Sequence, residues 1–115
     1  MALDPLTLRP KLARGTGGYS GPALKPVALA CVSACAGAVD VPIVGMGGVQ
    51  SGLDVLELVA AGASVVALGT ILFSDPTAPG RIRQELTEEA SSRGYLDPES
   101  ARGVANSYFN ETPAK

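Results

Sequence analysis

Apolar residues along the chain fall into short continuous runs and into longer stretches compatible with helices. Two short runs, 41–46 and 65–68, have the length of buried strands, and each leads directly into glycine. Helices are predicted before, between and after these runs, over about 26–38, 51–61 and 75–93. Because strands and helices alternate, the strands should pair in parallel through right-handed crossovers. The pattern therefore predicts an α/β fold made of consecutive βα units.

Residues typical of helix ends support these bounds. Ser51 with Asp54 three residues later has the spacing of a capping box, and Gly62 fits the position that ends the helix. Asp75 before a proline predicts the cap of the next helix, after a single helical turn at 71–74. The few charges in 26–38 indicate a helix that is largely covered by other elements.

The two ends of the chain carry weaker signals. Residues 1–21 are expected to be a loop with a strand stub at 6–8, because 15–21 is rich in glycine. A second Asp-Pro pair predicts a short helix over about 97–105, and 106–115 is expected to be a frayed tail. The βα units thus occupy 22–105.

Composition narrows the possible functions. The chain has 115 residues with 9 basic and 11 acidic side chains, a net charge of −2, which argues against nucleic acid as a partner. It contains no histidine, and its 2 cysteines are too few for a disulfide framework or a four-thiolate zinc site, so no metal site is predicted. No export signal and no apolar stretch of about 20 residues is present, which predicts a cytoplasmic protein that does not cross a membrane.

Glycine is enriched at positions where parallel α/β folds bind ligands. Gly21 precedes a predicted helix, Gly47 and Gly48 end the first strand, and Gly69 with Thr70 ends the second. Carboxyl ends of parallel strands lie at one edge, where backbone N–H groups without side chains can converge on an anion. The pattern favours a phosphate-binding strand pair, and the alternative is that these glycines only form turns.

Three segments with this glycine pattern resemble one enzyme family. The sequences GGYSGPALKP at 17–26, VPIVGMGGV at 41–49 and AGASVVALGT at 61–70 are similar to the C-terminal part of dihydroorotate dehydrogenase. The likeness runs over about 8–105 and is greatest to the catalytic subunit of the cytoplasmic NAD-linked type, since the membrane-linked type usually differs at Gly69. It implies that 1–115 is a partial domain, the last two βα units of an FMN-binding (β/α)8 TIM barrel.

The resemblance also implies roles for individual residues. The whole enzyme oxidises dihydroorotate to orotate in pyrimidine biosynthesis with FMN as its cofactor. The resemblance implies that five residues contact FMN: Gly21, Gly47, Gly48, Gly69 and Thr70. All of these except Gly21 would hold the FMN phosphate. Tyr19 departs from the leucine that is usual beside the cofactor. An iron–sulfur subunit that accepts electrons is the implied protein partner.

No catalytic residue is assigned to this chain. The family's cysteine or serine base and its substrate-holding residues belong to segments expected to precede Met1, so the chain alone is expected to be inactive. Two alternatives stay open: a non-catalytic remnant that binds at most phosphate or flavin, and part of another FMN or sugar-phosphate barrel.

Four further side chains are given structural interpretations. Cys31 and Cys35 are expected to be inert thiols on a helix with apolar neighbours. Lys25 is interpreted as a solvated lysine, with phosphate contact as the alternative, and Glu85 as part of a solvated acidic face.

Overall fold

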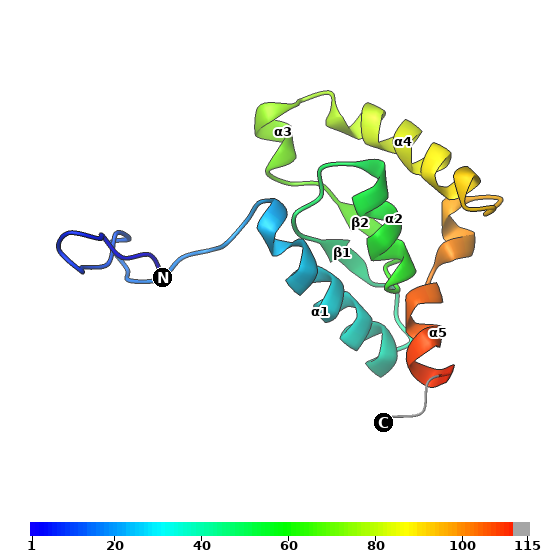
Figure 1. Cartoon of the computed structure of the whole chain (residues 1–115), viewed down its shortest axis with the longest axis horizontal. Helices are drawn as coiled ribbons and strands as arrows, with labels where there is room; N and C mark the ends of the chain where they lie inside the picture. The colour runs from blue at the N-terminus through cyan, green and yellow to red at the C-terminus, as the bar shows by residue number, and fades with distance from the viewer. Residues whose placement is uncertain (112–115) are drawn as a thin grey trace.

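The computed structural model describes residues 1–111, with the side chains of 110 and 111 excepted. A two-stranded sheet lies at the centre of the body, with helices beside it and along one side, and the first twenty residues extend away from that body (Figure 1). The elements in chain order are η1 (Pro22–Leu24), α1 (Lys25–Ala38), β1 (Val44–Met46), α2 (Gly52–Ala60), β2 (Val65–Ala67), α3 (Ile71–Ser74), α4 (Ala78–Ser92), η2 (Pro98–Ala101) and α5 (Val104–Glu111).

The two strands pair in parallel, as the alternation of elements predicts. Val44 lies opposite Val65, and Met46 lies opposite Ala67. Gly45, between the two residues of β1, is buried because that face of the strand packs closely against helical and loop residues. A Cβ atom at Gly45 would lie 2.9 Å from the Cβ of Ala63, so the close packing depends on glycine. The α/β class is therefore confirmed.

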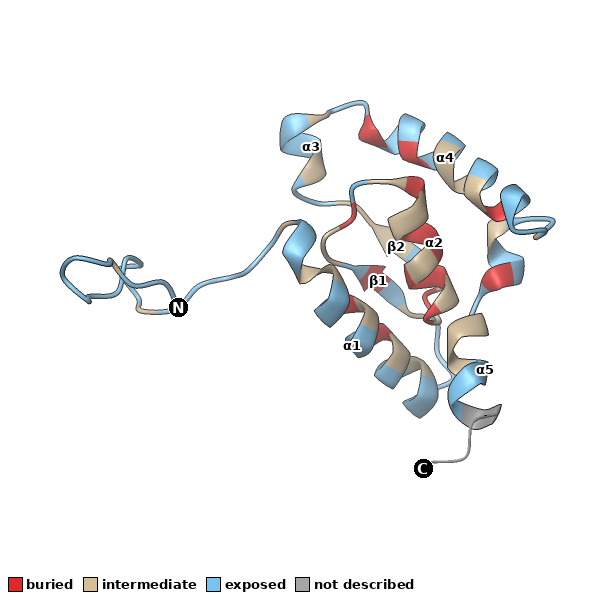
Figure 2. Cartoon of the chain, in the orientation of Figure 1, coloured by how far each residue is buried: buried red, intermediate tan, exposed pale blue. Residues whose placement is uncertain are grey.

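Helix α2 is the centre of the core. Its buried residues include Val55, Leu58 and Val59, and Leu58 is completely buried. Figure 2 shows that burial concentrates on α2 and on the sides of α1 and α4 that face it. This arrangement fixes the start of α2, which follows the glycine pair at the end of β1.

The opposite face of the sheet is open, which corrects the prediction of strands buried on both faces. Val44, Met46 and Val65 are 56%, 60% and 59% exposed. Side chains alternate along a strand, so these residues share one face, and the described helices cover only the other. Helix α1 is also less covered than expected, since its buried residues are Ala28 and Val32.

The helix ends agree with the sequence at α2 and differ at α4. Ser51 and Asp54 form the capping box, with the Asp54 N–H donating to Ser51 Oγ over 3.3 Å and the Ser51 N–H donating to Asp54 Oδ2 over 3.0 Å. Asp75 is not the cap of α4, which begins at Ala78. The Asp75 carboxylate instead accepts from the Thr77 N–H and hydroxyl, and this local turn delays the helix.

Both chain ends differ from expectation. The strand stub predicted at 6–8 is wrong, because the Asp4 carboxylate accepts from the N–H groups of Leu6 and Thr7 and makes a turn there. Part of the segment expected to fray is helix α5, and residues 112–115 lie outside the described residues. Asn106 anchors α5, since its amide donates to the Ala61 carbonyl and accepts from the Ser33 hydroxyl.

Candidate functional site

A cleft of about 350 Å³ lies where both strands end. It is bounded by the end of β1, by the end of β2 and by the turn before η1, three segments that are far apart in the sequence. All five residues predicted to bind a ligand line it: Gly21, Gly47, Gly48, Gly69 and Thr70. A smaller hollow of about 150 Å³ adjoins it, and Gly21, Gly48 and Thr70 line both. The fold thus brings the separate glycine motifs into one place.

The lining of the cleft offers backbone donors. Within residues 1–111, the N–H groups of Gly48, Gly69 and Thr70 donate no hydrogen bond to another protein group. Gly48 is half-buried and Gly69 and Thr70 are exposed, so these N–H groups are open to water or to a ligand in the cleft. Several such donors around one cleft favour an anion with several acceptor oxygens, such as a phosphate group.

Gly47 and Gly48 are required by the packing of the chain itself. Both have positive φ, +122° and +74°. A Cβ atom at Gly48 would lie 2.8 Å from the Lys25 backbone nitrogen and 3.0 Å from the Gly21 carbonyl oxygen. The loop after β1 therefore lies directly against the start of α1, and this contact forms one wall of the cleft.

Gly69 has no such internal reason to be glycine. Its φ lies outside the left-handed region, and no protein atom lies within 4 Å of a Cβ built on it. A side chain there would enter the space beside the cleft without disturbing the chain. An open glycine next to unpaired N–H groups fits a site where a ligand approaches the backbone closely.

Lys25 is an ion-paired lysine, which corrects the prediction of a solvated one. Its ammonium lies 2.6 Å from Asp54 Oδ1 and 2.6 Å from Glu57 Oε2. Hydrogen bonds to Asp54 first and Glu57 second raise the pKa of Lys25. Its charge is thus directed to α2. Because the backbone nitrogen of Lys25 lies against Gly48, the ion pair reinforces the wall of the cleft.

The carboxylate of Asp54 holds the loop after β1 from the other side. Its Oδ2 atom accepts from the Gln50 N–H over 2.8 Å, in addition to the capping bond from Ser51. Burial raises the pKa of Asp54, but the bonds from Lys25 and Gln50 outweigh it, and the pKa lies below its ordinary value. The ionised form therefore ties this loop to both helices.

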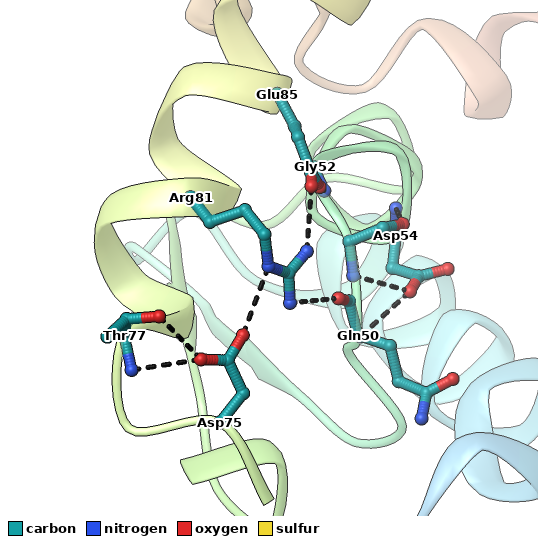
Figure 3. Close-up of polar contacts among 8 residues, drawn as sticks. Gln50, Gly52, Asp54, Asp75, Thr77, Arg81 and Glu85 are labelled. Atoms are coloured by element: carbon teal, nitrogen blue, oxygen red, sulfur yellow. Dashed lines mark hydrogen bonds and ion pairs between the residues drawn. The ribbon is translucent and has the colours of Figure 1, made fainter.

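A second network of hydrogen bonds and ion pairs links two loops that carry glycines of the cleft, the loop after β1 (47–51) and the segment after β2 (68–75) (Figure 3). We call these the two glycine loops. Arg81 of α4 donates to Asp75 Oδ2 over 3.1 Å, to Glu85 Oε1 over 2.7 Å and to the Gln50 carbonyl over 3.2 Å. Glu85 in turn accepts from the Gly52 N–H over 2.8 Å, so the prediction of a solvated Glu85 is wrong. Only the Arg81–Glu85 pair has a sequence signal, the i, i+4 spacing, whereas the contact to Gln50 requires the fold.

Charge and hydrogen bonding shift the pKa values of this network. Hydrogen bonds to Glu85 first and Asp75 second raise the pKa of Arg81. The N–H of Gly52 and then Arg81 lower the pKa of Glu85. The Thr77 hydroxyl lowers the pKa of Asp75 most, burial raises it, and hydrogen bonds from Arg81 and the Thr77 N–H bring it below its ordinary value. All three groups are thus charged at neutral pH.

The two cysteines lie outside the cleft. Cys31 and Cys35 are free and exposed on α1, beside the apolar surface formed with Val27 and Val44. No helix within the described residues is both long enough and apolar enough to cross a bilayer.

Comparisons with known proteins agree on one family. The family model described as dihydroorotate dehydrogenase matches residues 1–90. The chain is 46% identical over 104 residues to the dihydroorotate dehydrogenase B (NAD(+)) catalytic subunit of Geobacter sulfurreducens, covering 90% of this chain and 34% of that protein. It is 50% identical over 86 residues to a Solibacter usitatus protein with the provisional name dihydroorotate dehydrogenase A (fumarate). This match covers 75% of this chain and 28% of that protein.

A solved structure gives the same answer. The crystal structure of DHODH from Eimeria tenella in complex with ferulenol superposes with a TM-score of 0.75 at 31% identity, covering 90% of this chain and 28% of that chain. The chain spans about a third of the length of the curated relatives that it matches.

Proposed function

The chain belongs to the dihydroorotate dehydrogenase family, and from this premise we propose that it forms the FMN-phosphate site of an enzyme that oxidises dihydroorotate to orotate. The observation that carries this proposal is the cleft in which all five predicted residues meet beside unpaired backbone N–H groups. The N–H groups of Gly48, Gly69 and Thr70 would donate to the phosphate. Gly21 would approach the ribityl and ring side.

FMN fits the chemistry of this cleft. The donors are neutral N–H groups and the Thr70 hydroxyl, with Lys25 engaged elsewhere, so the site recognises phosphate oxygens through hydrogen bonds. The open space at Gly69 admits a group close to the backbone. When bound, FMN supplies the electron acceptor for the oxidation. The contribution of this chain is to bind and orient it, since no catalytic residue is assigned here.

The wider setting follows from the same family. We propose a cytoplasmic enzyme of pyrimidine biosynthesis whose barrel is completed by further strands, because two strands with one open face cannot close. Several relatives are named as the catalytic subunit of an NAD(+) enzyme, which supports an iron–sulfur partner as electron acceptor.

Two other possibilities rest on specific observations. The Solibacter relative carries a name with fumarate, which supports a fumarate-linked enzyme as the second candidate. A non-catalytic remnant that binds at most phosphate or flavin is the other candidate, because the described cleft offers donors to a phosphate group and no assigned catalytic residue. An upstream coding segment for the missing strands, with a cysteine or serine base, would favour an enzyme over a remnant.

A chimaera provides the test. This chain replaces the matching third of the Geobacter sulfurreducens catalytic subunit, which supplies the remaining barrel. We expect the purified chimaera to retain FMN, to bind riboflavin far more weakly and to oxidise dihydroorotate. Equal affinity for FMN and riboflavin would show that the cleft does not bind the phosphate.

A further inference from the structure

We propose that Arg81 is a positioning residue for the cleft, one that holds its two glycine loops at a fixed distance. This inference rests on the proposed function, because it concerns the same site. Arg81 lines neither the cleft nor the adjoining hollow, so it does not touch the ligand there. Its effect reaches the ligand through the loops that it joins.

The two loops belong to different βα units. Gln50, whose carbonyl accepts from Arg81, lies two residues after Gly48. Asp75, whose carboxylate accepts from Arg81, lies at the end of the short helix α3 that follows Thr70. A single guanidinium therefore connects the loop after β1 with the segment after β2 (Figure 3).

The third contact fixes the guanidinium itself. Glu85, one turn further along α4, holds the NH1 group over 2.7 Å, and its other oxygen accepts from Gly52 at the start of α2. A Cβ atom at Gly52 would lie 2.2 Å from the Leu86 backbone nitrogen, so α2 and α4 touch backbone to backbone at this point. Arg81 thus extends from a closely packed helix junction.

Arginine is required at this position by geometry. The Nε, NH1 and NH2 groups of Arg81 each contact a different partner: Asp75, Glu85 and Gln50. A planar guanidinium presents its donors in a fixed fork, whereas a lysine ammonium is a single point on a flexible stem. The side chain is 40% exposed, and exposed ion pairs contribute little to stability, so we assign the network to geometry instead of to folding.

The test compares variants of the chimaera described above. Arg81→Met and Arg81→Lys remove the fork, and Arg83→Met is the matched control, because Arg83 is exposed on the same helix and its side chain makes no hydrogen bond or ion pair within the described residues. We expect both Arg81 variants to lose FMN affinity by about 10-fold, the scale on which outer partners of a site act. Riboflavin affinity and the melting temperature should match the control. FMN affinity equal to that of Arg83→Met would overturn the inference.

A second measurement needs no cofactor. In ¹H–¹⁵N spectra of the full chain, we expect Arg81→Met to shift the amide signals of both Gly48 and Thr70, and Arg83→Met to shift neither. Unchanged signals at either loop would overturn the inference independently of FMN. If the parent chimaera does not distinguish FMN from riboflavin, the proposed function fails, and these spectra still decide whether Arg81 joins the loops.

Discussion

Replacing Gly69 with valine should remove ligand binding while leaving the chain folded. No protein atom lies within 4 Å of a Cβ at Gly69, and its φ is open to any residue. Surface substitutions without a clash change the free energy of unfolding by about 0.5 kcal/mol or less. For a domain of this size, that corresponds to a shift of the melting temperature of at most about 4 °C.

The loss of binding should be much larger. Valine at Gly69 would occupy space beside the cleft and keep a phosphate from the N–H groups of Gly69 and Thr70. Hydrogen bonds to charged groups contribute about 1.5–3 kcal/mol each, so losing two costs about 3–6 kcal/mol. Since each 1.4 kcal/mol is tenfold, FMN affinity should fall roughly a hundredfold or more.

The assay uses the chimaera and compares two valine variants. Gly37→Val is the matched control, because Gly37 is exposed on α1, also has no atom within 4 Å of a built Cβ and does not line the cleft. Flavin absorbance after gel filtration, FMN titration and thermal unfolding are measured on both. Full FMN retention by Gly69→Val would refute the placement of the phosphate. A large fall in its melting temperature would refute the reasoning about space.

Four other outcomes are expected. Gly47→Val should destabilise the fold by about 1–3 kcal/mol in urea unfolding, because a Cβ there lies 2.9 Å from the Ala28 Cβ at a φ of +122°. The isolated chain with added FMN should show no dihydroorotate oxidation. It should also self-associate with increasing concentration in sedimentation, and Val44→Thr should reduce this by making the open face of the sheet less apolar. Finally, the pKa of Asp54 is lowered on folding, so its ionised carboxylate stabilises the fold at pH values above the unfolded pKa of 3.8. This stabilisation is lost as the pH falls through the folded pKa. The stability advantage of the natural chain over Asp54→Asn should therefore shrink in urea unfolding as the pH falls below about 5.

The elements with local signals could be predicted from the sequence. The capping box at Ser51 and the helix end at Gly62 depend on residues within one turn of each other, and both are present. The boundary at Asp75 failed for a reason that is also local. Its carboxylate can cap a helix or close a turn with Thr77, and residue type alone does not decide between the two.

The candidate site shows a different limit. Glycine spacing predicted that these residues lie together at one edge of the sheet, and they line one cleft there, yet it treated Gly47 and Gly69 alike. The structure distinguishes them, since a Cβ atom built on Gly47 would contact Ala28, whereas a Cβ atom built on Gly69 would contact no protein atom. The contacts of Lys25 and Arg81 could not be predicted from the sequence for a related reason. Asp54 lies 29 residues from Lys25 along the chain, and Gln50 lies 31 residues from Arg81. Contacts of that separation depend on how the helices pack.

The open face of the sheet and the cleft are parts of one surface. Met46 and Ala67 lie opposite each other at the ends of the strands, on the same face as the exposed Val44 and Val65. Both Met46 and Ala67 also line the cleft. A segment that covers the apolar face would therefore reach the wall of the cleft and exclude water from it, which strengthens hydrogen bonds to a bound phosphate. Completion of the sheet and retention of the cofactor should accordingly be linked, so the chimaera, whose further strands would cover this face, should hold FMN more tightly than the isolated chain.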